Sequence, residues 1–141
     1  MNNVQRATEM DFYVTGKAGA SKAGNTTAGD ESSARNTMNL VVEEPISLVL
    51  FYAPECPYSQ VILPLYQELV NSIVGCRFFQ VDICENPRIV ALSVGTAFPL
   101  IVVPTIILFH YGVPYQLLTD NDYSMTQLKE ILLNSTRELK F

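Results

Sequence analysis

The fold is decided by Phe51-Tyr52-Ala53-Pro54-Glu55-Cys56-Pro57-Tyr58-Ser59, a stretch that continues the apolar run of residues 46–51. Such a nearly unbroken apolar run predicts a strand that is buried on both faces of a sheet. Residues 60–74 carry apolar side chains at helical spacing and predict a helix. Cys56 therefore lies in the turn that connects the predicted strand to the N-terminus of the predicted helix. The free N–H groups and the dipole at a helix N-terminus favour a thiolate, so Cys56 is a candidate reactive thiol, the alternative being a buried structural cysteine.

Length and charge narrow the classes of function. The chain has 141 residues, enough for one domain with a substantial core, and a formal net charge of −5. It shows no basic patch, so we expect no nucleic-acid binding. The longest apolar stretch, residues 98–109, is too short to span a bilayer and contains two prolines. We also find no signal-peptide pattern, and therefore expect no membrane segment in this chain, although a tether outside it is compatible with the sequence.

The first third of the chain differs in composition from the rest. Residues 1–15 read as a lead-in with a candidate edge strand at residues 11–15. Residues 16–37 contain no Leu, Ile, Val or aromatic residue, which predicts a flexible, tether-like linker. Residues 38–141 are predicted to form the folded domain, with residues 40–42 closing a short helix or forming an irregular lead-in.

The order of elements after the Cys56 turn predicts an α/β domain. We expect Pro64 to kink the first helix and Gly75 to end it. We expect a strand at residues 76–83, a short helix at 88–92 and a hairpin of strands at 106–110 and 115–118. A last helix should follow a cap at residues 120–122, with Leu128, Ile131 and Leu132 facing inward. A helical crossover makes the first two strands parallel, and the hairpin is antiparallel. The sheet is thus mixed, with four to five strands and helices on both faces.

This order, together with the Cys-x-x-Ser turn, resembles the thioredoxin fold over roughly the last two thirds of the chain. Residues 51–54 are similar to the tetrapeptide before the active-site turn of the protein disulfide isomerase branch. Val103-Pro104-Thr105 resembles the segment whose proline is cis in thioredoxins and faces the reactive cysteine. Pro64 and residues 82–87 also match landmarks of that family.

Four departures from the family pattern bear on the chemistry. Ser59 replaces the second, resolving cysteine of the turn. Glu55 replaces the usual tryptophan and should oppose thiolate formation, while Tyr58 replaces a histidine that would favour it. Leu50 stands in place of the buried carboxylate that relays a proton when the second cysteine attacks. Residues 95–104 are also a few residues longer than is usual in the family.

A Cys-x-x-Ser turn can form a mixed disulfide with a protein partner but cannot release it through a second thiol of its own. Release would need glutathione, a third cysteine or the partner's own thiol. Similar secretory-pathway proteins hold client proteins in this way, so the resemblance implies cysteine-containing clients and a role in disulfide exchange or thiol-mediated quality control. It implies the endoplasmic reticulum or secretory pathway, which sequons at Asn25 and Asn134 permit, with the cytoplasm as the alternative. No cofactor is expected.

Around Cys56 and Ser59 we expect a groove that accepts an extended peptide. Its predicted lining is Tyr52, Pro57, Tyr58, Val103 and Pro104.

The remaining cysteines and the single histidine have less specific interpretations. Cys76 and Cys84 lie at opposite ends of one predicted strand, roughly 26 Å apart, which is too far for a disulfide. Cys84 lies at the same sheet end as Cys56 and is a candidate remote resolving thiol, or else a partly buried bystander. His110 is expected at the surface. Three separated cysteines and one histidine lack the spacing of metal ligands, so no metal site is predicted.

Two other functions remain open at this point. Glu55, Tyr58 and Leu50 favour a redox-silent interaction module that uses the thioredoxin fold only for binding. The turn Cys56-Pro57-Tyr58-Ser59 also resembles that of glutaredoxins, which implies a glutathione-dependent monothiol enzyme.

Overall fold

The structure is a computed structural model that describes residues 4–15, 36–118, 127, 129–131 and 134. Its centre is a five-stranded sheet with the strand order β1-β5-β4-β6-β7. The strands are β1 (Val4–Arg6), β4 (Ser47–Tyr52), β5 (Arg77–Asp82), β6 (Thr105–His110) and β7 (Val113–Leu118). β1, β5 and β4 run parallel to one another, whereas β6 is antiparallel to both β4 and β7. The mixed α/β sheet expected from the sequence is confirmed.

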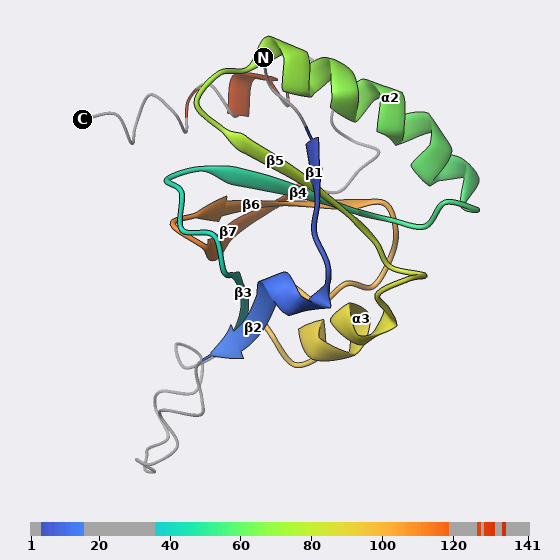
Figure 1. The fold of residues 1–141 in the computed structure, drawn as a ribbon, viewed down its shortest axis with the longest axis vertical. Helices are drawn as coiled ribbons and strands as arrows, with labels where there is room; N and C mark the ends of the chain where they lie inside the picture. Colours follow the sequence, from blue (N-terminus) through green and yellow to red (C-terminus); the bar gives the residue numbers. More distant parts are fainter. Residues whose placement is uncertain (1–3, 16–35, 119–126, 128, 132–133, 135–141) are drawn as a thin grey trace.

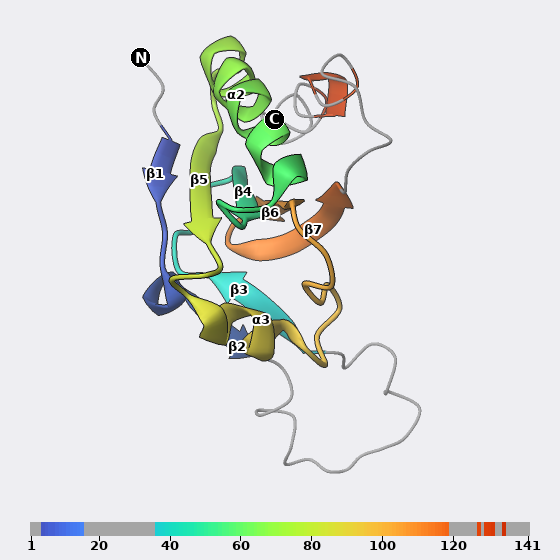
Figure 2. The ribbon, with the colours of Figure 1, turned by 90° about the vertical axis from the view of Figure 1, so that its right-hand side faces the viewer.

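Each face of the sheet has its own cover (Figures 1 and 2). The long helix α2 (Pro57–Ser72) lies across one face. On the other face lie the short helix α3 (Pro87–Ser93) and a two-stranded antiparallel sheet of β2 (Phe12–Thr15) and β3 (Thr37–Leu40). A single turn of 3-10 helix, η1 (Glu9–Asp11), joins β1 to β2.

The central strand β4 supplies both halves of the core because side chains alternate between the faces of a sheet. All six of its residues are buried. Leu48, Leu50 and Tyr52 belong to the cluster under α2, and Val49 and Phe51 belong to the cluster under β2, β3 and α3. This explains why residues 46–51 are apolar without alternation.

Tyr66 ties α2 to the sheet. Its side chain is almost fully buried, and its hydroxyl lies 2.9 Å from the carbonyl oxygen of Leu48 and 2.8 Å from that of Phe79. These two residues belong to β4 and β5, so the single hydroxyl fixes the helix over both central strands. A buried hydroxyl that is hydrogen-bonded in this way avoids the cost of lost hydration.

The N-terminal residues 4–15 form more of the folded domain than was predicted from the sequence. The strand expected at residues 11–15 forms as β2, but residues 4–6 also form β1, an edge strand of the main sheet. Ala7 and Phe12 belong to the core beneath α3. The prediction that placed the folded domain after residue 37 missed them because β1 is short and polar, and is held by backbone pairing with β5. Leu40 is the last residue of β3, and residues 41–42 have no regular secondary structure. The expected irregular lead-in is therefore found at residues 41–42, and the alternative of a short helix is wrong.

The helix boundaries differ from expectation at the C-terminal end of α2. The helix ends at Ser72 rather than at Gly75, because the buried side chain of Ile73 turns into the core on an extended backbone. Gly75 then occupies a left-handed turn, with φ of 93°, that leads into β5. Pro64 lies inside α2 as predicted, and the kink expected there stays a prediction.

The last predicted helix is only partly described. Its expected cap at residues 120–122 and the inward-facing Leu128 and Leu132 lie outside the described residues, as does most of the predicted linker. Residues 127, 129–131 and 134 are helical, and Ile131 packs against the core under α2.

Candidate active site

Cys56 is the N-cap residue of α2. Its backbone is extended, with φ of −82° and ψ of 124°, and Pro57 follows at the first helical position, where a missing N–H costs nothing. The turn before it is closed by the N–H of Cys56, which donates to the carbonyl of Ala53 at 3.0 Å. The hydroxyl of the buried Ser59 accepts the N–H of Ala53 at 3.2 Å. These bonds hold the thiol at the point where the helix begins.

The surroundings of the Cys56 thiol favour its ionised form. The thiol is partly exposed, and its pKa is lowered below the ordinary value of 9.0. The largest cause is the backbone N–H of Ser59. Burial opposes it, and the N–H of Tyr58 and the hydroxyl of Ser59 add to the lowering. Free N–H groups of the first helical turn therefore prevail over desolvation. Glu55 is exposed, and the opposition expected from its charge does not prevent the net lowering.

The loop before β6 forms the opposite wall. The peptide bond between Val103 and Pro104 is cis, and the Cys56 sulfur lies 4.0 Å from the carbonyl oxygen of Val103. Val103 and Pro104 are partly buried. The structure thus brings the Cys56 turn, which includes Ser59, next to the Val103-Pro104 segment, although Cys56 and Val103 are 47 residues apart in the chain.

Apolar side chains near the turn are open to solvent. Tyr58, on the first turn of α2, is 72% exposed. Ile101 and Val102, which lead into the cis peptide bond, are also exposed. The predicted groove lined by Pro57, Tyr58, Val103 and Pro104 stays a prediction, with these side chains available for it.

Comparison with known proteins decides the family. The family model described as Thioredoxin matches residues 30–133. The chain belongs to the thioredoxin family. Over 75 residues it is 29% identical to the uncharacterized protein 196R of Invertebrate iridescent virus 6, a match that covers 53% of this chain and 43% of that protein. Over 90 residues it is 29% identical to thioredoxin domain-containing protein 15 of Homo sapiens, covering 64% of this chain and 24% of that protein.

The chain therefore spans less than half the length of either curated relative. Among solved structures, the thioredoxin Mala s 13 of Malassezia sympodialis superposes with a TM-score of 0.59 at 15% identity, covering 96% of this chain and 93% of that one. At this identity the likeness shows the fold alone. None of the helices in the described part of the chain is long and apolar enough to cross a membrane.

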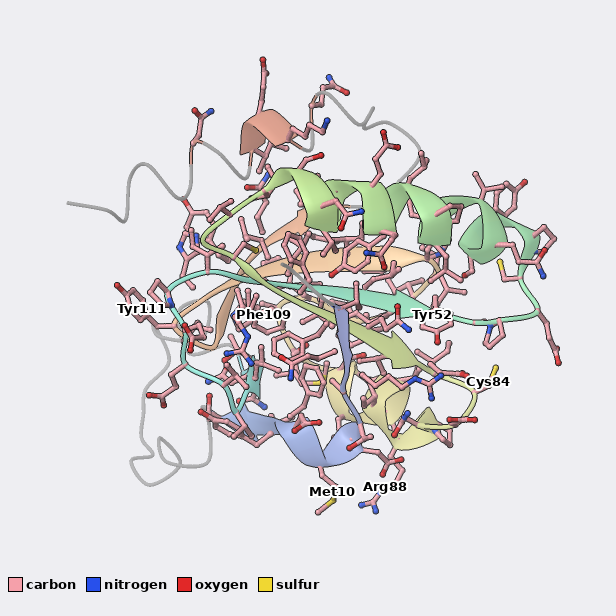
Figure 3. The ribbon with its side chains drawn as sticks, turned by 45° about the horizontal axis from the view of Figure 1, so that its top comes forward. Met10, Tyr52, Cys84, Arg88, Phe109 and Tyr111 are labelled. Atoms are coloured by element: carbon pink, nitrogen blue, oxygen red, sulfur yellow. The ribbon has the colours of Figure 1, made fainter. Side chains whose placement is uncertain are left out.

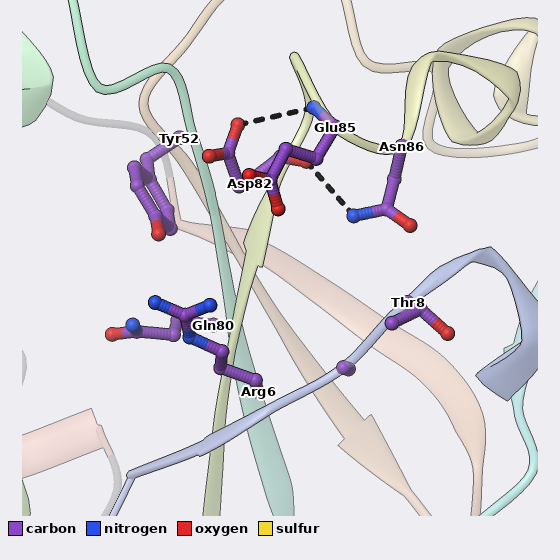
Figure 4. Close-up of a pocket in the computed structure, with 8 residues that line it drawn as sticks. Arg6, Thr8, Tyr52, Gln80, Asp82, Glu85 and Asn86 are labelled. Atoms are coloured by element: carbon purple, nitrogen blue, oxygen red, sulfur yellow. Dashed lines mark hydrogen bonds between the residues drawn. The ribbon is translucent and has the colours of Figure 1, made fainter.

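Tyr52 occupies a different place from the other residues predicted for the groove. Its side chain is only 7% exposed and lines a separate cavity with Arg6, Asp82 and Glu85 (Figure 4). The lining of that cavity includes neither Cys56 nor Pro104. Sequence reasoning could not find this cavity, because Arg6 belongs to the segment that was interpreted as a lead-in outside the domain.

The other two cysteines of this thioredoxin domain lie in contrasting environments. All three thiols are free, and the expectation that Cys76 and Cys84 form no disulfide stays a prediction. Cys76 is buried, and desolvation raises its pKa to about 12. Cys84 is exposed, and Figure 3 shows it at the edge of the molecule, beyond the end of β5. Its role as a remote resolving thiol stays a prediction, while the alternative of a partly buried bystander is wrong about its burial.

His110 lies at the end of the sheet away from Cys56. His110 is the last residue of β6, which runs antiparallel to β4. Thr105, the first residue of β6, pairs with Phe51 near the Cys56 turn, whereas Phe109 pairs with Ser47 at the other end of β4. The ring of His110 stacks on that of Tyr115 with centroids 3.9 Å apart, and His110 is partly buried rather than fully at the surface as expected. Within the described residues, no three His, Cys, Asp or Glu side chains gather so as to hold a metal ion.

Proposed function

We propose that this thioredoxin-domain chain forms mixed disulfides with client proteins through Cys56, as a single-cysteine member of the protein disulfide isomerase-like branch. One observation carries the proposal. Cys56 is a partly exposed thiol at the start of α2, its pKa is lowered by the N–H groups of that helix, and a serine stands three residues later. A thiolate is the nucleophile of disulfide exchange, so these features favour attack.

The proposed step exchanges one disulfide for another. The Cys56 thiolate attacks one sulfur of a disulfide in the client, a bond forms between these two sulfurs, and the client's other sulfur leaves as a thiolate. No net oxidation or reduction occurs. The client is then attached to Cys56 by a mixed disulfide.

The second half of the reaction depends on a thiol from elsewhere. Ser59 is fully buried, and its hydroxyl accepts the N–H of Ala53, so it offers no sulfur to attack the mixed disulfide. A thiolate of the client can attack the client sulfur of the mixed disulfide, which restores the Cys56 thiolate and leaves the client with a rearranged or re-formed disulfide. Glutathione can replace it by attacking the same sulfur. The exposed Cys84 is a third candidate for release.

The compartment follows from the substrate. Client disulfides persist in oxidising compartments such as the lumen of the endoplasmic reticulum, so we place the reaction there or elsewhere in the secretory pathway. The Phe-Tyr-Ala-Pro sequence at residues 51–54 and the Cys-x-x-Ser turn support this branch of the family. The domain would act within a longer protein if this chain, like the matching regions of its relatives, is one part of a larger whole.

The test uses a small protein with scrambled disulfides as the probe. The purified chain is incubated with it, thiols are blocked, and adducts are separated on a non-reducing gel. We expect a mixed-disulfide band with the native chain and with Cys84→Ser, which serves as the matched control. The band should vanish with Cys56→Ser. Ser59→Cys should weaken it, because the new thiol releases the probe. A band that persists in Cys56→Ser would contradict the proposal.

A redox-silent interaction module is the second candidate, and Leu50 favours it. This side chain is fully buried at the place where the family has a proton-relaying carboxylate. If the native chain forms no adduct and the pKa of Cys56 is measured at or above the ordinary value, this second function is supported. Reduction of the probe that requires glutathione would instead favour the glutaredoxin-like alternative.

A further inference from the structure

We propose that the cavity between β1 and the loop that joins β5 to α3 binds the zwitterionic head of an α-amino acid. The recognised chemistry is one ammonium and one carboxylate on the same carbon, present in a free amino acid and in the γ-glutamyl end of glutathione. The site needs nothing from Cys56, so it stands or falls separately from the proposed thiol chemistry.

The cavity is formed where three strands end side by side. Arg6 comes from β1, Tyr52 is the last residue of β4, Asp82 is the last of β5, and Glu85 follows in the loop (Figure 4). Its volume is about 70 Å³. This is room for roughly five water-sized groups, which matches the five non-hydrogen atoms of an amino-acid head.

The hydroxyl of Tyr52 is available to a ligand of the cavity. The residue as a whole is only 7% exposed and lines the cavity. The hydroxyl itself is open to solvent, so a ligand placed in the cavity can reach it. Burial raises the pKa of Tyr52, with further raising by Asp82 and Glu85 and lowering by Arg6, so the hydroxyl keeps its proton at neutral pH. It can therefore donate a hydrogen bond to an oxygen placed in the cavity.

Charges of opposite sign face the same cavity without pairing. The described ion pairs join Arg77 to Glu44 and Arg88 to Glu9, and neither involves the charges of the cavity. Arg6 stands on the β1 side and Asp82 with Glu85 on the loop side. A ligand with a carboxylate toward Arg6 and Tyr52 and an ammonium toward the two acids would satisfy both signs.

The carboxylate of Asp82 is already oriented. Its Oδ1 accepts the backbone N–H of Cys84 at 2.8 Å and that of Glu85 at 3.3 Å, which leaves Oδ2 for a ligand. Asn86 fixes the wall behind it, donating from Nδ2 to the carbonyl of Asp82 at 3.0 Å and accepting the N–H of Glu9 at 3.1 Å. The cavity is thus held between the N-terminal segment and the loop before any ligand binds, which lowers the entropic cost of binding.

The experiment titrates the full chain by calorimetry and NMR with four probes: glycine, S-methylglutathione, acetate and methylamine. We expect glycine, S-methylglutathione or both to bind saturably in the low-millimolar range, with Kd of about 1–10 mM. Acetate and methylamine should bind at least ~10-fold more weakly, because each offers only one of the two charges. Glycine binding alone identifies free amino acids as the source, and S-methylglutathione binding alone identifies the γ-glutamyl group. The methyl group on sulfur excludes disulfide exchange with Cys56.

Three conservative variants locate the site. Tyr52→Phe, Arg6→Gln and Asp82→Asn should each weaken binding by ~10-fold or more, since each removes one hydrogen bond to a charged group. Asp82→Asn keeps an oxygen for the loop N–H groups, and Arg6 is exposed, so both variants should fold. Glu44→Gln, on a carboxylate outside the cavity, is the matched control and should bind as the native chain does. The proposal is overturned if neither zwitterion binds saturably, if methylamine binds as well as glycine, or if binding survives Arg6→Gln.

Discussion

Cys56 and Cys76 stand at the two ends of the same helix–strand unit, and their environments differ in every respect that matters to a thiol. Cys56 precedes α2, is partly exposed and has helical N–H groups directed at its sulfur, and its pKa is lowered. Cys76 follows α2 and precedes β5, is buried, and has its pKa raised to about 12 by desolvation. The thiol of Cys76 donates a hydrogen bond to the carbonyl of its neighbour Arg77 at 3.4 Å, a bond that only the protonated thiol can make.

The difference shows that this fold distributes reactivity by position along a helix. The N-terminus of α2 offers hydrogen-bond donors, which stabilise an anion. Beyond the C-terminus of the same helix, Cys76 meets the apolar core that includes Ile73 and Phe78. Burial there penalises the anion without any donor to offset it. One residue type thus serves as a candidate nucleophile at one end and as a small core side chain at the other.

The largest expected effect is on chemical reactivity. Three or more pKa units separate the two thiols, so at neutral pH the thiolate population of Cys56 should exceed that of Cys76 by ~1000-fold or more. A thiolate of lower pKa is also less nucleophilic, which offsets about half of this difference on a logarithmic scale, so we expect iodoacetamide to modify Cys56 at least ~30-fold faster than Cys76 in the folded chain. Peptide mass spectrometry of samples quenched over time measures both rates in one experiment.

Unfolding the chain in denaturant provides the control for that measurement. The two rates should then converge, because both thiols return to ordinary environments. Comparable rates in the folded chain would mean that the proposed contrast between the ends of α2 is wrong.

The next effect is on stability at alkaline pH. In the unfolded chain the Cys76 thiol has its ordinary pKa of 9.0, and in the folded chain a pKa of about 12. Between these values the unfolded state loses the proton while the folded state keeps it. The unfolded state then binds fewer protons, so the free energy of unfolding falls as pH rises, by up to ~1.4 kcal/mol per pH unit. The stabilisation is fully present below pH 9 and is lost as pH rises toward 12.

Cys76→Ala isolates this contribution. Urea unfolding at about pH 8 and about pH 10.5 should show that the native chain loses ~2 kcal/mol more than the variant does. Burial also raises the pKa of Tyr66, which destabilises both proteins above pH 10 and largely cancels in the difference. Cys84→Ala, at an exposed thiol, is the matched control and should follow the native chain. Equal losses in all three proteins would count against a buried, neutral Cys76.

Local sequence patterns were enough to predict the central parts of the fold. The apolar run of β4, the helical spacing of α2 and the hairpin of β6 and β7 depend on short-range periodicity. All of these elements formed, although α2 ends at Ser72 rather than at Gly75 and β7 begins at Val113 rather than at Tyr115. The position of Cys56 at the start of α2 followed from the same reasoning. The prediction that the Val103-Pro104 segment faces Cys56 depended on the family resemblance, because no local pattern in the sequence indicates which turn this segment contacts.

The rest depended on contacts between distant segments. β1 has too few apolar residues to form a recognisable pattern, and its pairing with β5 joins residues that are more than 70 positions apart. The cavity at Tyr52 needs that pairing, since Arg6 reaches it only from β1. The sign of the Cys56 pKa shift also required coordinates. The sequence offered Glu55 against the thiolate and helix N–H groups for it, and only the placement of Ser59 and Tyr58 shows which effect is larger.

The smallest effect concerns the hydroxyl of Ser59, and it tests which group at the active-site turn lowers the Cys56 pKa. Ser59→Ala removes the hydroxyl but keeps the backbone N–H, which is the larger of the two contributions. The pKa of Cys56 should therefore rise and still remain below its ordinary value, as measured by the ultraviolet absorbance of the thiolate against pH. Ser72→Ala, at the exposed far end of α2, should leave the pKa of Cys56 unchanged. Ser59→Ala should also lose ~1 kcal/mol of stability, because the N–H of Ala53 loses its acceptor. If the pKa of Cys56 in Ser59→Ala instead rose to its ordinary value or above, the hydroxyl and not the backbone N–H would be the main cause of the lowered pKa. The contrast between the thiols at the two ends of α2 would then depend on one side chain rather than on the geometry of the helix.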